Sequence, residues 1–125
     1  IETLNVLKKQ GVKQAVVTNK EDPYTSKILA QHNMQDFFDV VVAGNTLPFK
    51  KPNPAVIAHC LEVLGEFKQD SLFVGDSEID VATAKNAGVT CWAVPYGYNA
   101  GRDISKANPD KLIDSLAVVP HFFKT

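Results

Sequence analysis

The sequence predicts an α/β fold in which a parallel sheet carries helices on both faces. Short apolar runs alternate with helical stretches along the chain, and this alternation is typical of parallel strands joined by right-handed crossovers. The runs are apolar at successive positions, as in Leu72–Val74, which indicates strands buried on both faces. Polar residues follow these runs directly, and ligands bind at the carboxyl ends of parallel strands in such folds. We therefore expect one three-layer domain over residues 1–125.

The first half of the chain is expected to form two helix–strand units. Residues 1–10 are predicted to be helical, and Val12–Thr18 to be the strand that follows. Asp22 should be the N-cap of the next helix and Pro23 its first residue. The second strand should centre on Val40–Val42. The helix between the two strands is expected to place four residues on one face: Tyr24, Ile28, Leu29 and His32.

The second half is predicted to repeat the pattern. A loop, Thr46–Pro52, precedes a helix that Asn53–Pro54 opens. Leu72–Val74 and Val89–Pro95 should be strands, and Pro109–Leu116 a short helix after a loop over residues 96–105. The helix after Pro54 has an apolar stripe at helical spacing: Ile57, Cys60, Leu61 and Leu64.

Composition excludes several classes of function. A net charge of −1 argues against a nucleic-acid or membrane surface, and no apolar run approaches the roughly 20 residues that span a bilayer. Cys60 and Cys91 have no metal or redox spacing, so we interpret them as core thiols in a cytoplasmic protein. The chain begins at Ile1 and its only methionine is Met34, from which we expect the later part of a longer protein. The oligomeric state is left open.

The stretch from Leu72 to Gly88 carries the strongest chemical pattern. Its apolar strand ends at Gly75 and is followed by two acids, Asp76 and Asp80. Two carboxylates four residues apart on a first helical turn would face the same way, and such a pair suits a hard cation bound through oxygen. The alternative is a solvated loop in which Ser77 or Asp76 only caps the helix.

Other polar residues are expected at the same edge of the sheet. Thr18 and Asn19 end one strand, and Lys51 lies in the loop after another. A hydroxyl and the N–H groups of a strand-to-helix turn can hold phosphate oxygens, and a lysine neutralises phosphate charge. With Asp76 and Asp80 these residues would make parts of a phosphoryl-transfer site. Taken singly, Thr18 could be a turn residue and Lys51 a solvated loop lysine.

These motifs resemble the haloacid dehalogenase superfamily of phosphatases over nearly the whole chain. VVTNK at Val16–Lys20 is similar to the family's second motif, and KKPNP at Lys50–Pro54 to its third, whose lysine directly precedes the proline. VGDSEID at Val74–Asp80 is similar to the fourth, GDSxxD. The likeness is closer still to the bacterial phosphoglycolate phosphatases within this superfamily, through TNK, FVGDS, AKNAG and the segment Tyr96–Asp110. The resemblance implies a Rossmann-like core domain, of which this chain would be the C-terminal portion.

The resemblance also implies a reaction: Mg²⁺-dependent hydrolysis of a small phosphate monoester, 2-phosphoglycolate first, through an aspartyl-phosphate. Thr18 and the Asn19 backbone would hold the phosphoryl group, and Lys51 would stabilise its charge. Asp76 would be a direct Mg²⁺ ligand. Asp80 would act from behind it, orienting Lys51 or a metal-bound water.

One departure from the family is large. The first motif, DxDGT, which carries the nucleophilic aspartate and the general acid/base, does not occur in this sequence. In the family its strand is the central one of the sheet, and a cap domain usually follows it. We therefore expect the chain alone to be inactive, and a sheet without that strand to expose two inner edges.

Several alternatives stay open from the sequence. The chain could be a non-catalytic module that binds phosphate or a partner, although four retained site residues argue against it: Thr18, Lys51, Asp76 and Asp80. The substrate could be a sugar phosphate or a pyrophosphate. A receiver domain would have its acids before its threonine and lysine, and a dinucleotide site needs a G-x-G-x-x-G that the chain lacks.

Overall fold

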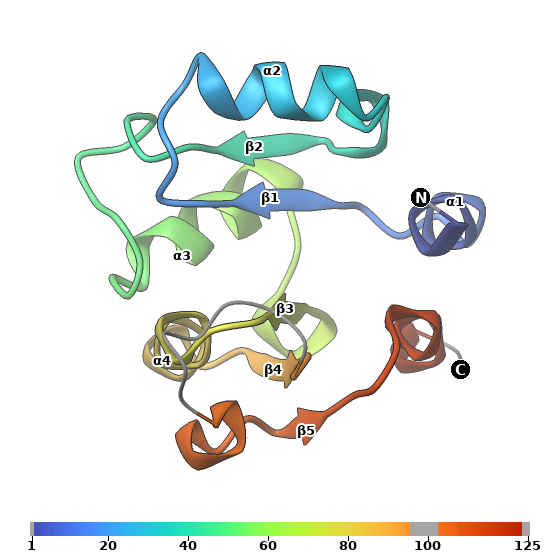
Figure 1. Cartoon of the computed structure of the whole chain (residues 1–125), viewed down its shortest axis with the longest axis vertical. Helices are drawn as coiled ribbons and strands as arrows, with labels where there is room; N and C mark the ends of the chain where they lie inside the picture. Colours follow the sequence, from blue (N-terminus) through green and yellow to red (C-terminus); the bar gives the residue numbers. More distant parts are fainter. Residues whose placement is uncertain (1, 96–102, 124–125) are drawn as a thin grey trace.

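The strands of the protein form two parallel sheets that lie side by side. The computed structural model describes residues 2–95 and 103–123. In it β1 pairs with β2, with Ala15 opposite Val40, and β3, β4 and β5 form a second sheet, with Leu72 opposite Thr90. Figure 1 shows the two sheets one above the other, with β1 and β3 as the facing strands. The α/β class and the parallel strands predicted from the sequence are confirmed.

The elements follow the predicted order over most of the chain. The helices are α1 (Glu2–Lys9), α2 (Tyr24–Gln31), α3 (Ala55–Leu64) and α4 (Glu78–Ala87). The strands are β1 (Ala15–Val17), β2 (Val40–Val42), β3 (Leu72–Gly75), β4 (Thr90–Ala93) and β5 (Lys111–Leu112). Four 3-10 segments complete the described chain: η1 (Gln35–Phe37), η2 (Lys68–Asp70), η3 (Ile104–Ala107) and η4 (Leu116–Phe123). No helix among these is long and apolar enough to cross a membrane.

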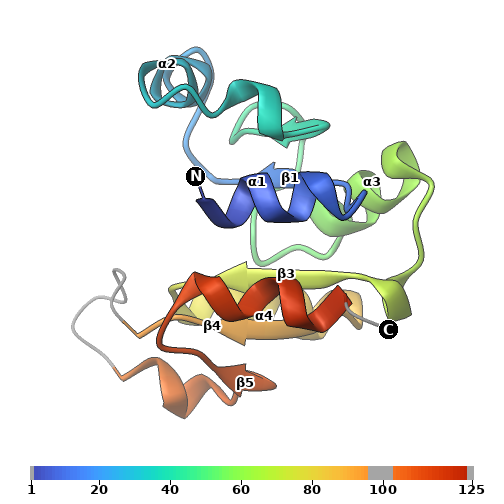
Figure 2. The same cartoon turned by 90° about the vertical axis from the view of Figure 1, so that its right-hand side faces the viewer.

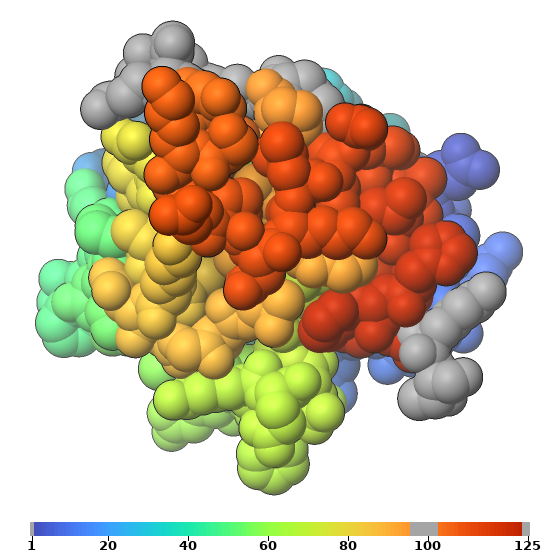
Figure 3. All heavy atoms as spheres, turned by 90° about the horizontal axis from the view of Figure 1, so that it is seen from below, coloured from blue at the N-terminus to red at the C-terminus, as the bar shows by residue number. Residues whose placement is uncertain are grey.

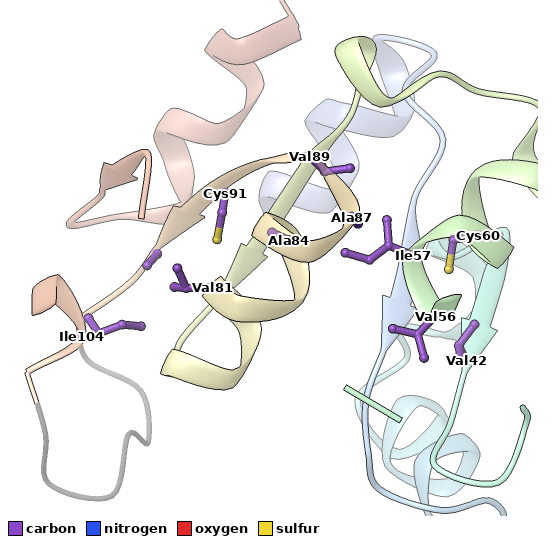
Figure 4. Packing of buried hydrophobic residues seen from close by; sticks show 11 residues of the cluster. Val42, Val56, Ile57, Cys60, Val81, Ala84, Ala87, Val89, Cys91 and Ile104 are labelled. Carbon is purple, nitrogen blue, oxygen red and sulfur yellow. The ribbon is translucent and has the colours of Figure 1, made fainter. Parts of the chain in front are cut away.

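Helices cover both faces of the sheets, as the sequence predicted. On one face, α1 contacts η4, and Leu7 packs there with Val94 and Val119; Figure 2 shows these two segments in front of the strands. On the other face, α3 contacts α4. Side chains of these two helices, of β2, of β4 and the residue before it, and of η3 form the larger core, whose members are drawn in Figure 4: Val42, Val56, Ile57, Cys60, Val81, Ala84, Ala87, Val89, Cys91, Ala93 and Ile104.

The predicted helix over Pro109–Leu116 is wrong. Lys111–Leu112 is instead a short strand that adds to the outer edge of β4. Asp110 fixes it, because its Oδ2 accepts the N–H of Cys91 at 2.7 Å and its own N–H donates to the Cys91 carbonyl at 2.9 Å. Pairing with the edge of β4 thus favours a strand over the helix that the local sequence predicts. Figure 3 shows the face where η3, β5 and η4 cover this edge.

Of the predicted face of α2, only Leu29 is buried. Thr25 and Leu29 are its buried residues, whereas Tyr24 is 59% exposed, Ile28 is 41% exposed and His32 is exposed. α2 lies at the outer edge of the β1–β2 sheet (Figure 1), so only a narrow stripe of it is covered.

Several predicted boundaries also shift. Both α2 and α3 begin one residue later than predicted, with Pro23 and Pro54 as their N-caps. Most of the predicted loop over residues 96–105 lies outside the described residues.

Candidate functional site

Asp80 is the centre of a hydrogen-bonded network at the carboxyl ends of the strands. It lies on the first turn of α4 and is only 5% exposed. Its Oδ1 accepts from Nζ of Lys51 at 2.6 Å. Its Oδ2 accepts from the N–H of Asp76 and from Oγ of Ser77, both at 3.1 Å. Both carboxylate oxygens of Asp80 thus accept hydrogen bonds, one from the loop that carries Lys51 and the other from the turn before α4. These bonds fix the orientation of the carboxylate.

The turn before α4 is built to bring Asp80 against the end of β3. Ser77 is the N-cap of α4, and its Oγ accepts the N–H of Asp80 at 3.3 Å. Gly75 ends β3, and a Cβ at this position would lie 2.3 Å from the Cβ of Asp80. Only glycine allows this approach. Asp76 precedes the N-cap of α4, so the expectation that it shares the first helical turn with Asp80 is wrong.

The side chain of Asn19 holds the backbone of Lys51, and both residues follow strands of the β1–β2 sheet. Asn19 Oδ1 accepts the N–H of Lys51 at 2.9 Å, and its Nδ2 donates to the Lys51 carbonyl at 3.3 Å. These two bonds tie the loop after β2 to the residue after β1. The loop passes close because Gly44 has no side chain: a Cβ there would lie 2.1 Å from the Asn19 carbonyl oxygen. The side chain of Lys51 is 14% exposed, and Lys50 beside it is exposed.

Thr18 and Asp76 lie next to this network with side chains that it does not use. Thr18 Oγ1 accepts the N–H of Lys20 at 3.1 Å, in the turn that leaves β1. Asp76 is half-buried, and within residues 2–95 and 103–123 no donor contacts its carboxylate. The structure thus places all five predicted residues at one edge: Thr18, Asn19, Lys51, Asp76 and Asp80.

The arrangement can stabilise negative charge but is only part of a metal site. The ammonium of Lys51 is held by the nearly buried carboxylate of Asp80. Its other N–H donors point away from that carboxylate and can bind an anion. Mg²⁺ in proteins takes one or two carboxylates and keeps several waters, so the carboxylate of Asp76, to which no described residue donates, suits it. In the described part of the chain, no group of at least three His, Cys, Asp or Glu side chains could hold a metal ion.

Sequence reasoning missed the structural roles that four residues have in the site. The task predicted for Asn19 was phosphate binding through its backbone, whereas the structure shows its side chain bonded to the backbone of Lys51. Ser77 was weighed only as a cap, whereas it also donates to Asp80. Gly44 and Gly75 allow the close approaches; Gly75 is the last residue of β3, and Gly44 comes two residues after the end of β2.

The chain is similar to proteins of one family. A family model described as haloacid dehalogenase-like hydrolase matches residues 1–94. The phosphoglycolate phosphatase of Pseudomonas putida is 45% identical over 120 residues, which make up 95% of this chain and 44% of that protein. This chain thus spans about half the length of the curated relatives it matches.

Two solved structures show the same likeness in three dimensions. A predicted phosphoglycolate phosphatase from Haemophilus somnus matches with a TM-score of 0.94 and 35% identity, over 98% of this chain and 55% of its own. A variant of CbbY from Rhodobacter sphaeroides, in complex with xylulose-(1,5)bisphosphate, has a TM-score of 0.80 and 28% identity. That match covers 93% of this chain and 52% of CbbY.

Proposed function

The chain belongs to the haloacid dehalogenase-like hydrolase family, and we propose that it forms the lysine, phosphate and metal side of a phosphatase site. The substrate we propose is a small phosphate monoester, 2-phosphoglycolate first, because the P. putida relative named phosphoglycolate phosphatase covers 95% of this chain. The single observation that carries the proposal is the 2.6 Å pair between Lys51 and Asp80. It places a fixed positive charge at the carboxyl edge of the strands, where a phosphate would bind.

Each residue of the site has a proposed task. The Thr18 hydroxyl and the Asn19 backbone N–H bind oxygens of the phosphoryl group, next to the turn that Thr18 already stabilises. Lys51 neutralises charge that develops on those oxygens, and Asp80 positions Lys51 through their contact. Asp76 would hold Mg²⁺, which when bound would neutralise phosphate charge.

The nucleophile is proposed to come from outside this chain. The sequence contains no DxDGT, and Asp80, the buried acid at the site, is already paired with Lys51. An aspartyl-phosphate therefore has no candidate carboxylate here except Asp76, which the proposal assigns to the metal. We accordingly expect no turnover by the chain alone. The free buried thiols, Cys60 and Cys91, are compatible with a cytoplasmic location.

The test is a chimaera in which this chain replaces the matching 120-residue stretch of the P. putida relative. With Mg²⁺, the chimaera should release phosphate from 2-phosphoglycolate, whereas the chain alone should not. Removal of Mg²⁺ with a chelator should abolish the release. Sugar phosphates and pyrophosphate, assayed in parallel, decide the substrate class. A folded chimaera that binds phosphate but hydrolyses none of these compounds would support a non-catalytic binding module instead.

A further inference from the structure

A buried hydroxyl outside the Lys51–Asp80 network holds the turn that follows β1. Thr25 lies in the first turn of α2 and is only 5% exposed. Its Oγ1 donates to the carbonyl of Lys20 at 2.8 Å. Lys20 directly follows the two residues to which phosphate binding is assigned, Thr18 and Asn19. The hydroxyl of Thr25 therefore contacts the backbone next to the proposed phosphate donors.

The hydroxyl of Thr25 reaches out of its own helix. A threonine hydroxyl in a helix can bond the carbonyl four residues earlier, as Thr83 does in α4, where Oγ1 donates to the Ile79 carbonyl at 2.6 Å. For Thr25 that carbonyl belongs to Glu21. It lies 3.4 Å from Oγ1 and already accepts the N–H of Thr25 at 3.2 Å. The shorter bond of the hydroxyl goes to Lys20, so it fixes the turn before α2 rather than the helix.

Two donors from different elements converge on the carbonyl of Lys20. The N–H of Gly44, in the segment after β2, and the hydroxyl of Thr25 both donate to it at 2.8 Å. In Figure 1 the chain leaves the end of β1 and rises past the end of β2 to α2. A carbonyl oxygen has two lone pairs, and here both have a donor. The two bonds together fix the orientation of this peptide group.

Lys20 transmits this constraint to the residues before it. Its N–H donates to Oγ1 of Thr18 at 3.1 Å, so Thr18 keeps its own hydroxyl hydrogen for another acceptor. Within residues 2–95 and 103–123, no hydrogen bond uses that hydroxyl hydrogen or the N–H of Asn19. These are the two donors assigned to the phosphoryl oxygens, and both adjoin a residue that Thr25 holds.

We propose, on the basis of the phosphate site assigned above, that Thr25 is a positioning residue for the phosphoryl group. Through Lys20, its hydroxyl holds the Thr18 hydroxyl and the Asn19 N–H in the orientation that binds phosphate oxygens. Without this hydroxyl the Lys20 carbonyl keeps only the donor from Gly44. The turn then gains conformational freedom that it must lose again when phosphate binds, so the affinity for phosphate falls.

The test measures binding of inorganic phosphate to the chimaera by calorimetry, together with kcat and KM for 2-phosphoglycolate. Thr25→Val removes the hydroxyl and keeps the shape of the side chain. Its dissociation constant for phosphate should rise about three- to tenfold, as expected for one lost neutral hydrogen bond. KM should rise by a similar factor and kcat should change less, because the turn binds the phosphate of the substrate and of the transition state alike. Thr25→Ser keeps the hydroxyl and should restore phosphate binding.

Thr83→Val is the matched control for the loss of a buried hydroxyl. Thr83 is 0% exposed, and its hydroxyl bonds a backbone carbonyl of its own helix. Urea unfolding should show similar losses of stability for the two valine variants, whereas only Thr25→Val should weaken phosphate binding. Thr25→Ala removes the same hydroxyl with a good helix former, and it takes the place of Thr25→Val if valine prevents folding.

Thr25 has no positioning role if the unsubstituted chimaera binds phosphate and the variant without the hydroxyl binds it equally well. The same conclusion follows if Thr25→Ser or Thr83→Val loses as much affinity as Thr25→Val, because packing or general stability would then explain the loss. If the unsubstituted chimaera binds no phosphate at all, the proposed function itself is refuted, and the role of Thr25 with it.

Discussion

The two sheets are joined at their carboxyl edge and separated in their middle. At the edge, Asn19 clamps Lys51, and Lys51 contacts Asp80, so a chain of polar contacts runs from β1 to β3. In the middle, β1 and β3 belong to separate sheets. The apolar contact of α3 with α4 behind the strands spans the gap.

This difference shows that the site does not require a continuous sheet. Side chains and two helices bring the candidate site residues together, although β1 and β3 belong to separate sheets. Substitutions of single residues test how strongly the joined carboxyl edge of the two sheets depends on each contact.

The largest effect is expected from Lys51→Ala in the chimaera. The substitution removes the positive charge at the phosphate site and leaves Asp80 without its cation, so kcat should fall by roughly 10²- to 10³-fold. Phosphate release measures it. Lys50→Ala is the matched control, because Lys50 is exposed and should change kcat little. Equal losses of kcat for the two variants would contradict a specific role of Lys51 in the site.

Gly75→Ala should disrupt the edge by crowding. The new Cβ would lie 2.3 Å from the Asp80 Cβ and 2.6 Å from its Oδ2, so Asp80 must move away from Lys51. Overpacking of this kind costs about 1–3 kcal/mol, measured by urea unfolding. Gly11→Ala is the control: Gly11 has a φ of +79° but no atom within 4 Å. It should lose stability through backbone strain yet keep the activity of the chimaera, whereas Gly75→Ala should lose both.

Asn19→Ala should have a smaller effect on catalysis. Both bonds to the Lys51 backbone disappear, so the ammonium becomes less well placed, and kcat should fall by about tenfold. Asn45→Ala is a suitable control, since the side chain of Asn45 bonds to the backbone of Asp22 in an exposed turn. If KM rises and kcat is unchanged, Asn19 contacts the substrate and does not position Lys51.

The smallest effect concerns the buried thiols on the α3–α4 face. Burial raises the pKa of Cys60 and of Cys91 from 9.0 to about 11. Below pH 9 both folded and unfolded thiols are protonated, so these groups add no pH dependence. Between pH 9 and 11 the unfolded chain loses its protons first, and stability should fall as pH rises.

Urea unfolding at several pH values measures this slope, and the double variant Cys60→Ala with Cys91→Ala should reduce it. At pH 8, iodoacetamide should label the two thiols only after unfolding. Rapid labelling of the folded chain would contradict their placement in the core.

The sequence was sufficient for the elements whose signals are local. Leu72–Gly75 is a strand and α4 ends at Gly88, as expected, because the apolar run and the left-handed glycine are both local features. The short strand at Lys111–Leu112 could not be predicted, since it depends on the edge of β4 and on the bonds of Asp110 to Cys91.

The residues of the site also differ in whether a local sequence signal predicts them. Asp76, Asp80 and Lys51 carry recognisable motifs, and the structure brings their loops together. The clamp of Asn19 on Lys51 joins residues 32 positions apart, and no spacing along the chain predicts it. The roles of these residues remain predictions until the variants are measured.

The measurement that most directly tests the joined edge is a double-mutant cycle on the chain alone. Lys51→Met and Asp80→Asn, singly and together, give the coupling free energy of a pair whose side chains are 14% and 7% exposed. Lys13→Met and Glu66→Gln give it for a second pair, whose side chains are 48% and 38% exposed. The buried pair should couple by at least about 1 kcal/mol and the exposed pair by about 0.5 kcal/mol or less. Equal, small couplings would contradict the claim that Lys51 and Asp80 join the two sheets across the gap.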